Sequence, residues 1–182
     1  KETGIPSTDK THKLNTTVYT VNVPKGTYVA VNSGKFVNEL MRGNGTVTKT
    51  SEDGVVEGFT FKLSGTSLSG EAVSLTAKTD STGKATFSNV LVGTYTVEEV
   101  NTPERYVVPA KKTVTITDGG NAQVSFENKL KRSDLTVTKT AEDGIIKDVE
   151  FKLTGTSLTG SKVSETVKTN ANGIAVFENL LP

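Results

Sequence analysis

An internal repeat limits how this 182-residue chain can fold. The segment VTKTSEDGVV at 47–56 recurs as VTKTAEDGII at 137–146, and FKLSGTSLSG at 61–70 recurs as FKLTGTSLTG at 151–160. Each recurrence lies 90 positions further along the chain without a gap, and more than half of the aligned positions are identical. One period has the usual size of a small domain. The sequence therefore predicts tandem domains of about 90 residues.

The same offset predicts where these domains begin and end. KFVNELMRGNGTV at 35–47 aligns with SFENKLKRSDLTV at 125–137. We expect residues 1–43 to be the C-terminal part of a preceding repeat, residues 44–132 to be a complete repeat, and residues 133–182 to be the N-terminal part of a following one. On this interpretation the chain is an excerpt from a longer array.

Residue usage indicates strands. Thr, Val, Ser and Gly are abundant, and runs rich in Ala, Leu and Glu are missing. The complete repeat predicts seven short strands separated by turn signals such as EDG and DSTG, at about 45–50, 57–64, 71–79, 84–88, 93–101, 111–117 and 121–130. We expect an all-β, two-sheet sandwich of the immunoglobulin-like or prealbumin-like kind. Alternation predicts as its core Val47, Phe59, Phe61, Leu63, Val73, Leu75, Phe87, Tyr95, Val97, Val114, Ile116, Val124 and Phe126.

Composition argues against several functions. Lys plus Arg, 21 in number, nearly balances Asp plus Glu, 20 in number, so no net field attracts nucleic acid. Cysteine is absent, which excludes disulfides and thiolate metal sites. His12 is the only histidine, so we expect neither a metal site nor a cofactor. No apolar run is long enough to insert into a membrane.

Three polar residues interrupt the apolar faces of the predicted strands. Alternation places Lys49, Glu99 and Asn128 on the inner faces of the first, fifth and last strands of the complete repeat. A lysine near a sheet edge usually extends to water, and a strand asparagine often bonds only to backbone. Glu98 is the alternative to Glu99, but alternation directs it outward. Three such interruptions together predict one buried cluster of an amine, a carboxyl and an amide.

The complete repeat resembles the B-type repeats of Gram-positive surface adhesins and pilins, the collagen-adhesin B or prealbumin-like sandwich. The resemblance rests on VTKT, FKL, TDSTGKATF, GTYTVEEVNTPERY and FENK. It implies an intramolecular isopeptide bond, with Lys49 as nucleophile, Asn128 as electrophile and Glu99 as proton shuttle. In the partial repeats it implies Lys139, Asn38 and, less directly, Glu2 as equivalents of these residues. One departure from the family pattern is Arg105, where the family often has Gly before Tyr106.

The cluster suits such chemistry. Burial disfavours both charged forms, so a neutral amine and a neutral carboxylic acid can coexist in a core. The acid can then polarise the Asn carbonyl and carry protons as ammonia leaves, while proximity in the folded core supplies most of the acceleration. This is self-cross-linking with a single turnover, so we do not expect an enzyme.

The resemblance implies a structural stalk or pilin module on the cell-wall-anchored surface of a Gram-positive bacterium. The alternative is an adhesin repeat that binds host matrix protein or glycan, with a host ligand held by parts outside this sequence. VNVPKG at 21–26 is similar to the motif through which sortase links pilins, which makes Lys25 a candidate linkage lysine, although an ordinary strand end fits better. Expected partners are neighbouring repeats, and the two partial repeats predict head-to-tail self-association.

Overall fold

The computed structural model describes residues 1–23, 25–26 and 34–181. Within these residues the regular structure consists of strands. The strands are β1 (Arg42–Ser51), β2 (Thr60–Thr66), β3 (Ala72–Lys78), β4 (Lys84–Leu91), β5 (Gly93–Val100), β6 (Lys112–Ile116), β7 (Asn121–Asn128), β8 (Ser133–Thr138), β9 (Glu150–Thr156), β10 (Lys162–Lys168) and β11 (Ile174–Leu180). No helix in the part of the chain described is long and apolar enough to cross a membrane.

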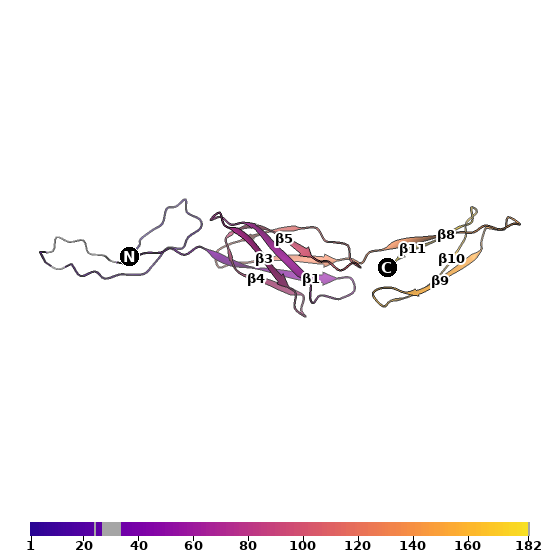
Figure 1. The fold of residues 1–182 in the computed structure, drawn as a ribbon, viewed down its shortest axis with the longest axis horizontal. Coiled ribbons are helices and arrows are strands. Elements are labelled where there is room, and N and C mark those ends of the chain that lie inside the picture. Colours follow the sequence, from indigo (N-terminus) through magenta and orange to yellow (C-terminus); the bar gives the residue numbers. More distant parts are fainter. Residues whose placement is uncertain (24, 27–33, 182) are drawn as a thin grey trace.

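Strands β1 to β7 form a two-sheet sandwich in the middle of the molecule (Figure 1). One sheet has the order β4-β1-β7 and the other has the order β3-β2-β5-β6. Each of the seven strands predicted for the complete repeat overlaps one of these, with ends that differ by at most three residues. The predicted all-β sandwich is confirmed.

Strand β1 lies at the centre of its sheet, antiparallel to β4 and parallel to β7. The parallel pair is in register over its whole length, with Lys49 opposite Phe126 and Ser51 opposite Asn128. Because the first and last strands of the sandwich run in the same direction, the chain enters at one end and leaves at the opposite end (Figure 1).

The core lies between the sheets and is mostly the predicted one. Its buried residues are Val47, Phe59, Phe61, Leu63, Ala85, Phe87, Val90, Tyr95, Val97, Tyr106, Val114, Ile116, Phe126 and Leu130. The prediction was wrong for Leu75, which is 38% exposed. Leu75 belongs to β3, an edge strand whose face is incompletely covered by the other sheet. Val73 and Val124 are only partly buried against the core.

The flanking segments extend from opposite ends of the sandwich (Figure 1). Residues 133–181 contain two antiparallel pairs, β8 with β11 and β9 with β10. The pair of Val137 with Ala175 repeats, 90 positions later, the pair of Val47 with Ala85.

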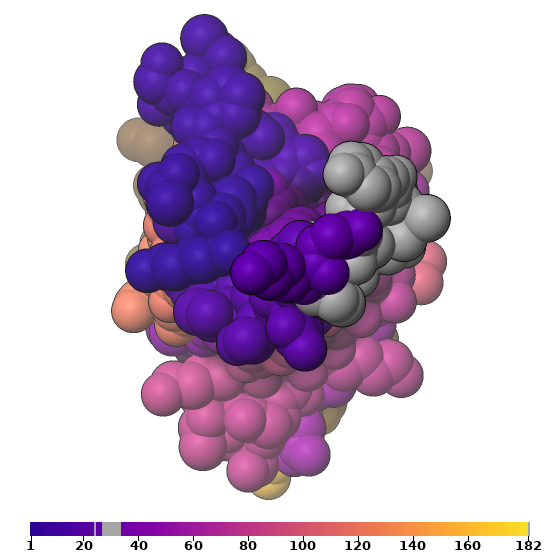
Figure 2. Space-filling view, turned by 90° about the vertical axis from the view of Figure 1, so that its left-hand side faces the viewer, coloured from indigo at the N-terminus to yellow at the C-terminus, as the bar shows by residue number. Residues whose placement is uncertain are grey.

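Before β1, His12 and Leu40 form an isolated bridge, flanked by backbone hydrogen bonds from Lys13 N to Glu39 O and from Met41 N to Thr11 O. Viewed from this end, the N-terminal segment lies in front of the sandwich (Figure 2). Its contacts with the sandwich include an ion pair of 3.2 Å between Lys13 and Asp118. The limits of the three predicted repeats stay a prediction.

Candidate functional site

Lys49, Glu99 and Asn128 meet inside the sandwich. Lys49 comes from β1, Glu99 from β5 and Asn128 from β7, so both sheets contribute. The three residues are 1%, 6% and 0% exposed. The structure therefore brings together the three polar residues that interrupt the apolar strand faces.

Hydrogen bonding within this cluster is incomplete. Asn128 Nδ2 donates to Glu99 Oε1 at 2.8 Å. Lys49 Nζ lies 4.0 Å from Glu99 Oε2 and donates to the carbonyl oxygen of Thr50 at 2.5 Å. Glu99 Oε2 and Asn128 Oδ1 are buried without a hydrogen-bond partner in the described part of the chain. Unpaired buried oxygens cost about 1–3 kcal/mol each, so this arrangement is costly unless protons or bonds are redistributed.

The surroundings of the amine are apolar. Lys49 Nζ lies 4.4 Å from the ring centroid of Phe59 and 6.0 Å from that of Tyr106. Burial lowers the pKa of the Lys49 amine, and the carboxylates of Glu99, Asp53 and Glu127 oppose this shift only in part. A lowered pKa favours the neutral amine, which is the nucleophilic form.

A glycine turn fixes the strand that carries the lysine. Gly83 has a positive φ of 75°, and a Cβ at this position would lie 2.6 Å from the Lys49 carbonyl oxygen. Lys49 N donates to the Gly83 carbonyl oxygen at 2.7 Å. The same arrangement recurs at Gly173, whose carbonyl oxygen accepts from Lys139 N at 2.7 Å. In both places the contact lies beside an antiparallel strand pair, β1 with β4 and β8 with β11.

Glu98 points away from the cluster, as alternation predicts. Its carboxylate pairs with Lys111 Nζ at 2.5 Å near the surface. The hydrogen bond from Lys111 lowers the pKa of the Glu98 carboxyl. Glu98 therefore lies on the wrong face to exchange protons with Lys49 and Asn128.

The turn after β1 holds the chain that follows Asn128. Glu52 N donates to the Asn128 carbonyl oxygen at 3.0 Å, and Leu130 N donates to Glu52 Oε2 at 3.0 Å. Arg132 pairs with the other oxygen of the Glu52 carboxylate. This role of Glu52 was not predicted from the sequence, although the EDG tripeptide recurs at 142–144 and is a signal that could have indicated it.

In the flanking segments the corresponding residues are separated. Asn38 Nδ2 donates to Glu2 Oε1 at 3.1 Å, and Glu2 Oε2 accepts from Asn15 N at 2.8 Å. Lys139 Nζ donates to the Thr140 carbonyl oxygen, as Lys49 does to its own neighbour. The N-terminal segment thus pairs a carboxylate with an amide, and the lysine lies on the far side of the sandwich.

Lys25 is exposed at a turn with Gly26, while Pro24 of the same motif lies outside the described residues. No group of three or more His, Cys, Asp or Glu side chains in the described ranges could hold a metal ion.

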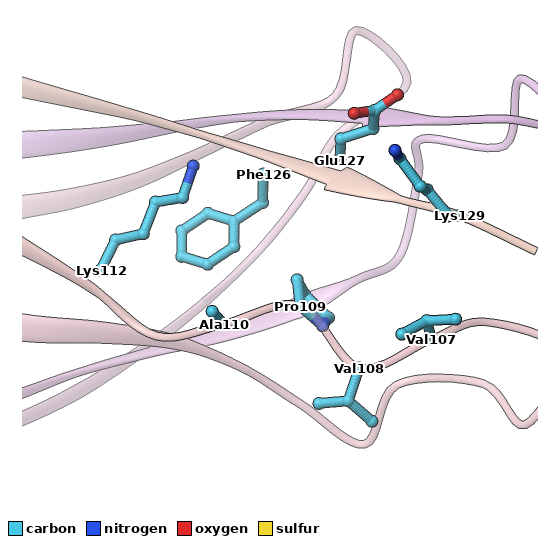
Figure 3. Close-up of a pocket in the computed structure, with 8 residues that line it drawn as sticks. All are labelled: Val107, Val108, Pro109, Ala110, Lys112, Phe126, Glu127 and Lys129. Carbon is cyan, nitrogen blue, oxygen red and sulfur yellow. The ribbon is translucent and has the colours of Figure 1, made fainter.

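A surface groove lies along β7 (Figure 3). The loop Val107–Ala110 and Lys112 at the start of β6 form one wall, and Phe126, Glu127 and Lys129 form the other (Figure 3). Two carbonyl oxygens of β7 and its C-terminal extension are occupied here, because Lys112 Nζ donates to Ser125 O at 2.7 Å and Val107 N donates to Lys129 O at 2.9 Å. These contacts protect the free edge of β7 against pairing with a foreign strand.

The sandwich matches one family model. Residues 43–130 match the family model described as SpaA, prealbumin-like fold domain. A search of curated proteins finds no match.

Among solved structures, the Bacillus anthracis TIE protein is 24% identical, with a TM-score of 0.60, over 78% of this chain and 26% of that one. The minor pilin GBS52 of Streptococcus agalactiae is 23% identical, with a TM-score of 0.42, over 53% of this chain and 48% of that one. The chain thus spans about a quarter of the TIE protein chain that it matches. At this level of identity, the likeness to the TIE protein shows the fold alone.

Proposed function

We propose that the chain is a structural module of a Gram-positive surface stalk or pilus, from the premise that residues 43–130 match the SpaA prealbumin-like fold domain. The observation that carries the proposal is the buried cluster of Lys49, Glu99 and Asn128. A core that places an amine, a carboxyl and a carboxamide together without completing their hydrogen bonds is poorly explained by packing alone. It is well suited to forming a covalent bond between β1 and β7.

The proposed reaction joins Lys49 to Asn128 once in the life of each molecule. The neutral amine leaves its bond to the Thr50 carbonyl oxygen and attacks Cγ of Asn128, while protonated Glu99 donates to Oδ1. A proton lost by Nζ passes through Glu99 to Nδ2, the Cγ–Nδ2 bond breaks, and ammonia leaves. The Nζ–Cγ amide remains, and Glu99 ends with the proton that it held at the start.

The position of this bond would let the domain resist tension between its two ends. It would connect the first and last strands of the sandwich directly, across a parallel pair that already lies in register. Tension applied to the two ends of the domain would then pass through the amide bond. Strands β2 to β6 would stay outside the path of the force.

Mass spectrometry tests the proposal. The folded chain is expected to weigh less than its sequence by one ammonia, and a proteolytic digest is expected to contain a branched peptide that joins Lys49 to Asn128. Glu99→Ala is expected to recover the full mass, whereas Glu98→Gln, on the opposite face of β5, is expected to keep the lower mass. A wild-type chain of unshifted mass would refute the cross-link and with it the main support for the stalk function.

The partners of such a module are neighbouring repeats and further copies of the same chain. Glu2 and Asn38 repeat the carboxylate–amide bond of the central cluster, and Lys139 repeats the conformation of its lysine. We propose that the C-terminal segment of one molecule docks on the N-terminal segment of the next, with Lys139 facing Asn38. Such a head-to-tail contact does not close and gives filaments. Lys25 is accessible for linkage by a sortase-type transpeptidase, since its turn is exposed.

A further inference from the structure

A second polar cluster, formed by Asp53, Arg105 and Tyr106, lies beside the proposed cross-link. The Tyr106 hydroxyl donates to the Asp53 carboxylate at 2.7 Å. Arg105 Nε donates to Asp53 Oδ2 at 3.0 Å, and the other arm of the guanidinium donates to the Tyr106 hydroxyl at 2.9 Å. The guanidinium carbon lies 4.5 Å from the Tyr106 ring centroid. The three side chains therefore form a closed hydrogen-bonded triangle that none of the steps above uses.

This triangle ties a loop down over the site. Asp53 belongs to the turn after β1, whereas Arg105 and Tyr106 belong to the connection between β5 and β6. The connection is also bonded to the chain just beyond Asn128, because Lys131 N donates to the Arg105 carbonyl oxygen at 2.8 Å and Tyr106 bridges to Leu130. One loop thus contacts the segments that lead away from both proposed cross-link residues.

The Tyr106 ring closes the apolar wall around the amine. It is 1% exposed, and its centroid lies 5.8 Å from that of Phe59 and 6.0 Å from Lys49 Nζ. A buried phenol needs a hydrogen-bond partner for its hydroxyl. Asp53 and Arg105 supply this partner and so hold the ring where it excludes water from Lys49.

The Asp53 carboxylate that holds the Tyr106 ring also stabilises the charged form of the Lys49 amine. Three carboxyl groups act on the Lys49 amine, those of Glu99 from β5, Glu127 from β7 and Asp53 from the turn after β1, and each raises its pKa. A negative charge at Asp53 therefore favours the unreactive ammonium. The Arg105 guanidinium, paired with this carboxylate, offsets the charge.

We propose that Arg105 is a positioning residue for the cross-linking reaction, acting through its contacts with Asp53 and Tyr106. Its guanidinium balances the Asp53 carboxylate that anchors the Tyr106 ring, so the site closes over Lys49 without trapping the amine as an ammonium ion. The inference rests on the proposed Lys49–Asn128 bond. Arg105 stands where the family that the sequence resembles often has Gly before the Tyr, and the inference gives this departure a role.

The test measures the rate of cross-linking against pH. The full chain is synthesised in a cell-free system, quenched into urea before it reacts, and refolded by dilution into buffers from mildly acidic to alkaline. The loss of one ammonia is followed by intact mass. Removing the compensating charge in Arg105→Gln is expected to displace the rate profile to higher pH by on the order of one unit, and to slow the reaction about tenfold below its midpoint. The alkaline plateau should be retained.

If Arg105 acts by balancing the charge of Asp53, removing the Asp53 charge as well should restore the rate profile of Arg105→Gln. Asp53→Asn combined with Arg105→Gln removes both charges and keeps a hydrogen-bond acceptor for Tyr106, so its profile is expected to return to that of the wild type. Arg105→Lys keeps the charge and should shift the profile little. Arg132→Gln is the matched control, because Arg132 pairs with Glu52 in the same turn, and it should leave the midpoint unchanged.

The outcomes separate this inference from the proposed function. If the wild type never loses ammonia, the cross-link and the role of Arg105 both fail. If the wild type reacts and Arg105→Gln follows the same profile, only the role of Arg105 fails. A uniform slowing at every pH that the double variant does not rescue would make Arg105 a structural residue and also overturn the inference.

Discussion

Replacing Glu99 by Gln should remove the stability that the Lys49–Asn128 bond provides and leave the packing of the sandwich unchanged. The side chain keeps its size at a buried position, and Lys49 and Asn128 stay in place, but the amide cannot carry protons between them. The variant is therefore expected to fold without the Lys49–Asn128 bond. What it loses is the covalent constraint on the unfolded chain.

The size of this loss follows from the positions of the two residues. A bond from Lys49 to Asn128 would close a loop over 79 positions, nearly the whole sandwich. The chain-entropy relation for cross-links gives about 4–5 kcal/mol for a loop of that length. The altered hydrogen bond to Asn128 contributes only about 1 kcal/mol. For a domain of this size, the sum lowers the melting temperature by roughly 20–35 °C.

Thermal unfolding followed by circular dichroism, with urea titration in parallel, measures the difference. The urea m-value is expected to be larger for Glu99→Gln, because its unfolded chain is free to expose more surface. Glu98→Gln is the control. It removes an ion pair near the surface with Lys111 and should cost less than about 1 kcal/mol. A Glu99→Gln variant within about 1 kcal/mol of the wild type would refute the loop-closure argument.

Three further predictions concern other parts of the molecule. Burial raises the pKa of the Asp53 carboxyl, but hydrogen bonds from neighbouring side chains outweigh burial and lower the pKa to about 2. The stability that the lowered pKa provides is present above the ordinary Asp pKa of about 4 and is lost as the pH falls toward 2. Urea titrations of the wild type should therefore show a loss of about 2 kcal/mol over this range that Asp53→Asn lacks. An equal loss in that variant would contradict the assignment. Gly43→Ala would place a Cβ 2.2 Å from a backbone oxygen of the turn before β7 and should lower the free energy of unfolding in urea by about 1–3 kcal/mol. Gly155→Ala is the control, because the space around Gly155 is open, and it should not have this cost. Equal costs would argue against the clash. On a denaturing gel the concentrated chain should form a ladder that Asn38→Ala abolishes, and a single monomer band for the wild type would eliminate covalent head-to-tail joining.

Alternation along the strands was sufficient to predict the fold class and to place three polar residues in one core. The reason is that a strand has a period of two, so Lys49, Glu99 and Asn128 each had one possible face. Alternation does not say whether a face is covered. Leu75 was therefore assigned to the core, although it lies on an edge strand and is 38% exposed.

The residues that surround the cluster could not be found in this way. Tyr106 and Arg105 lie in a connection without regular periodicity, and their partner Asp53 is more than fifty positions away. Their contacts depend on how a loop crosses the end of a sandwich, which no local pattern encodes. Glu2 and Asn38 were given, from the resemblance, as equivalents of Glu99 and Asn128. Asn38 Nδ2 lies 3.1 Å from Glu2 Oε1, and the role of the two residues in a reaction stays a prediction.

The parallel pairing of β1 with β7 also bears on how genes for such proteins can change. Because the chain enters and leaves at opposite ends, a duplicated unit adds its full length to the axis and does not turn the array back on itself. Unequal recombination between similar repeats, 90 positions apart, would add or remove whole units and leave each junction intact. If the chain is part of a surface stalk, as proposed, the length of that stalk would change by whole units, while the chemistry inside each unit stays the same.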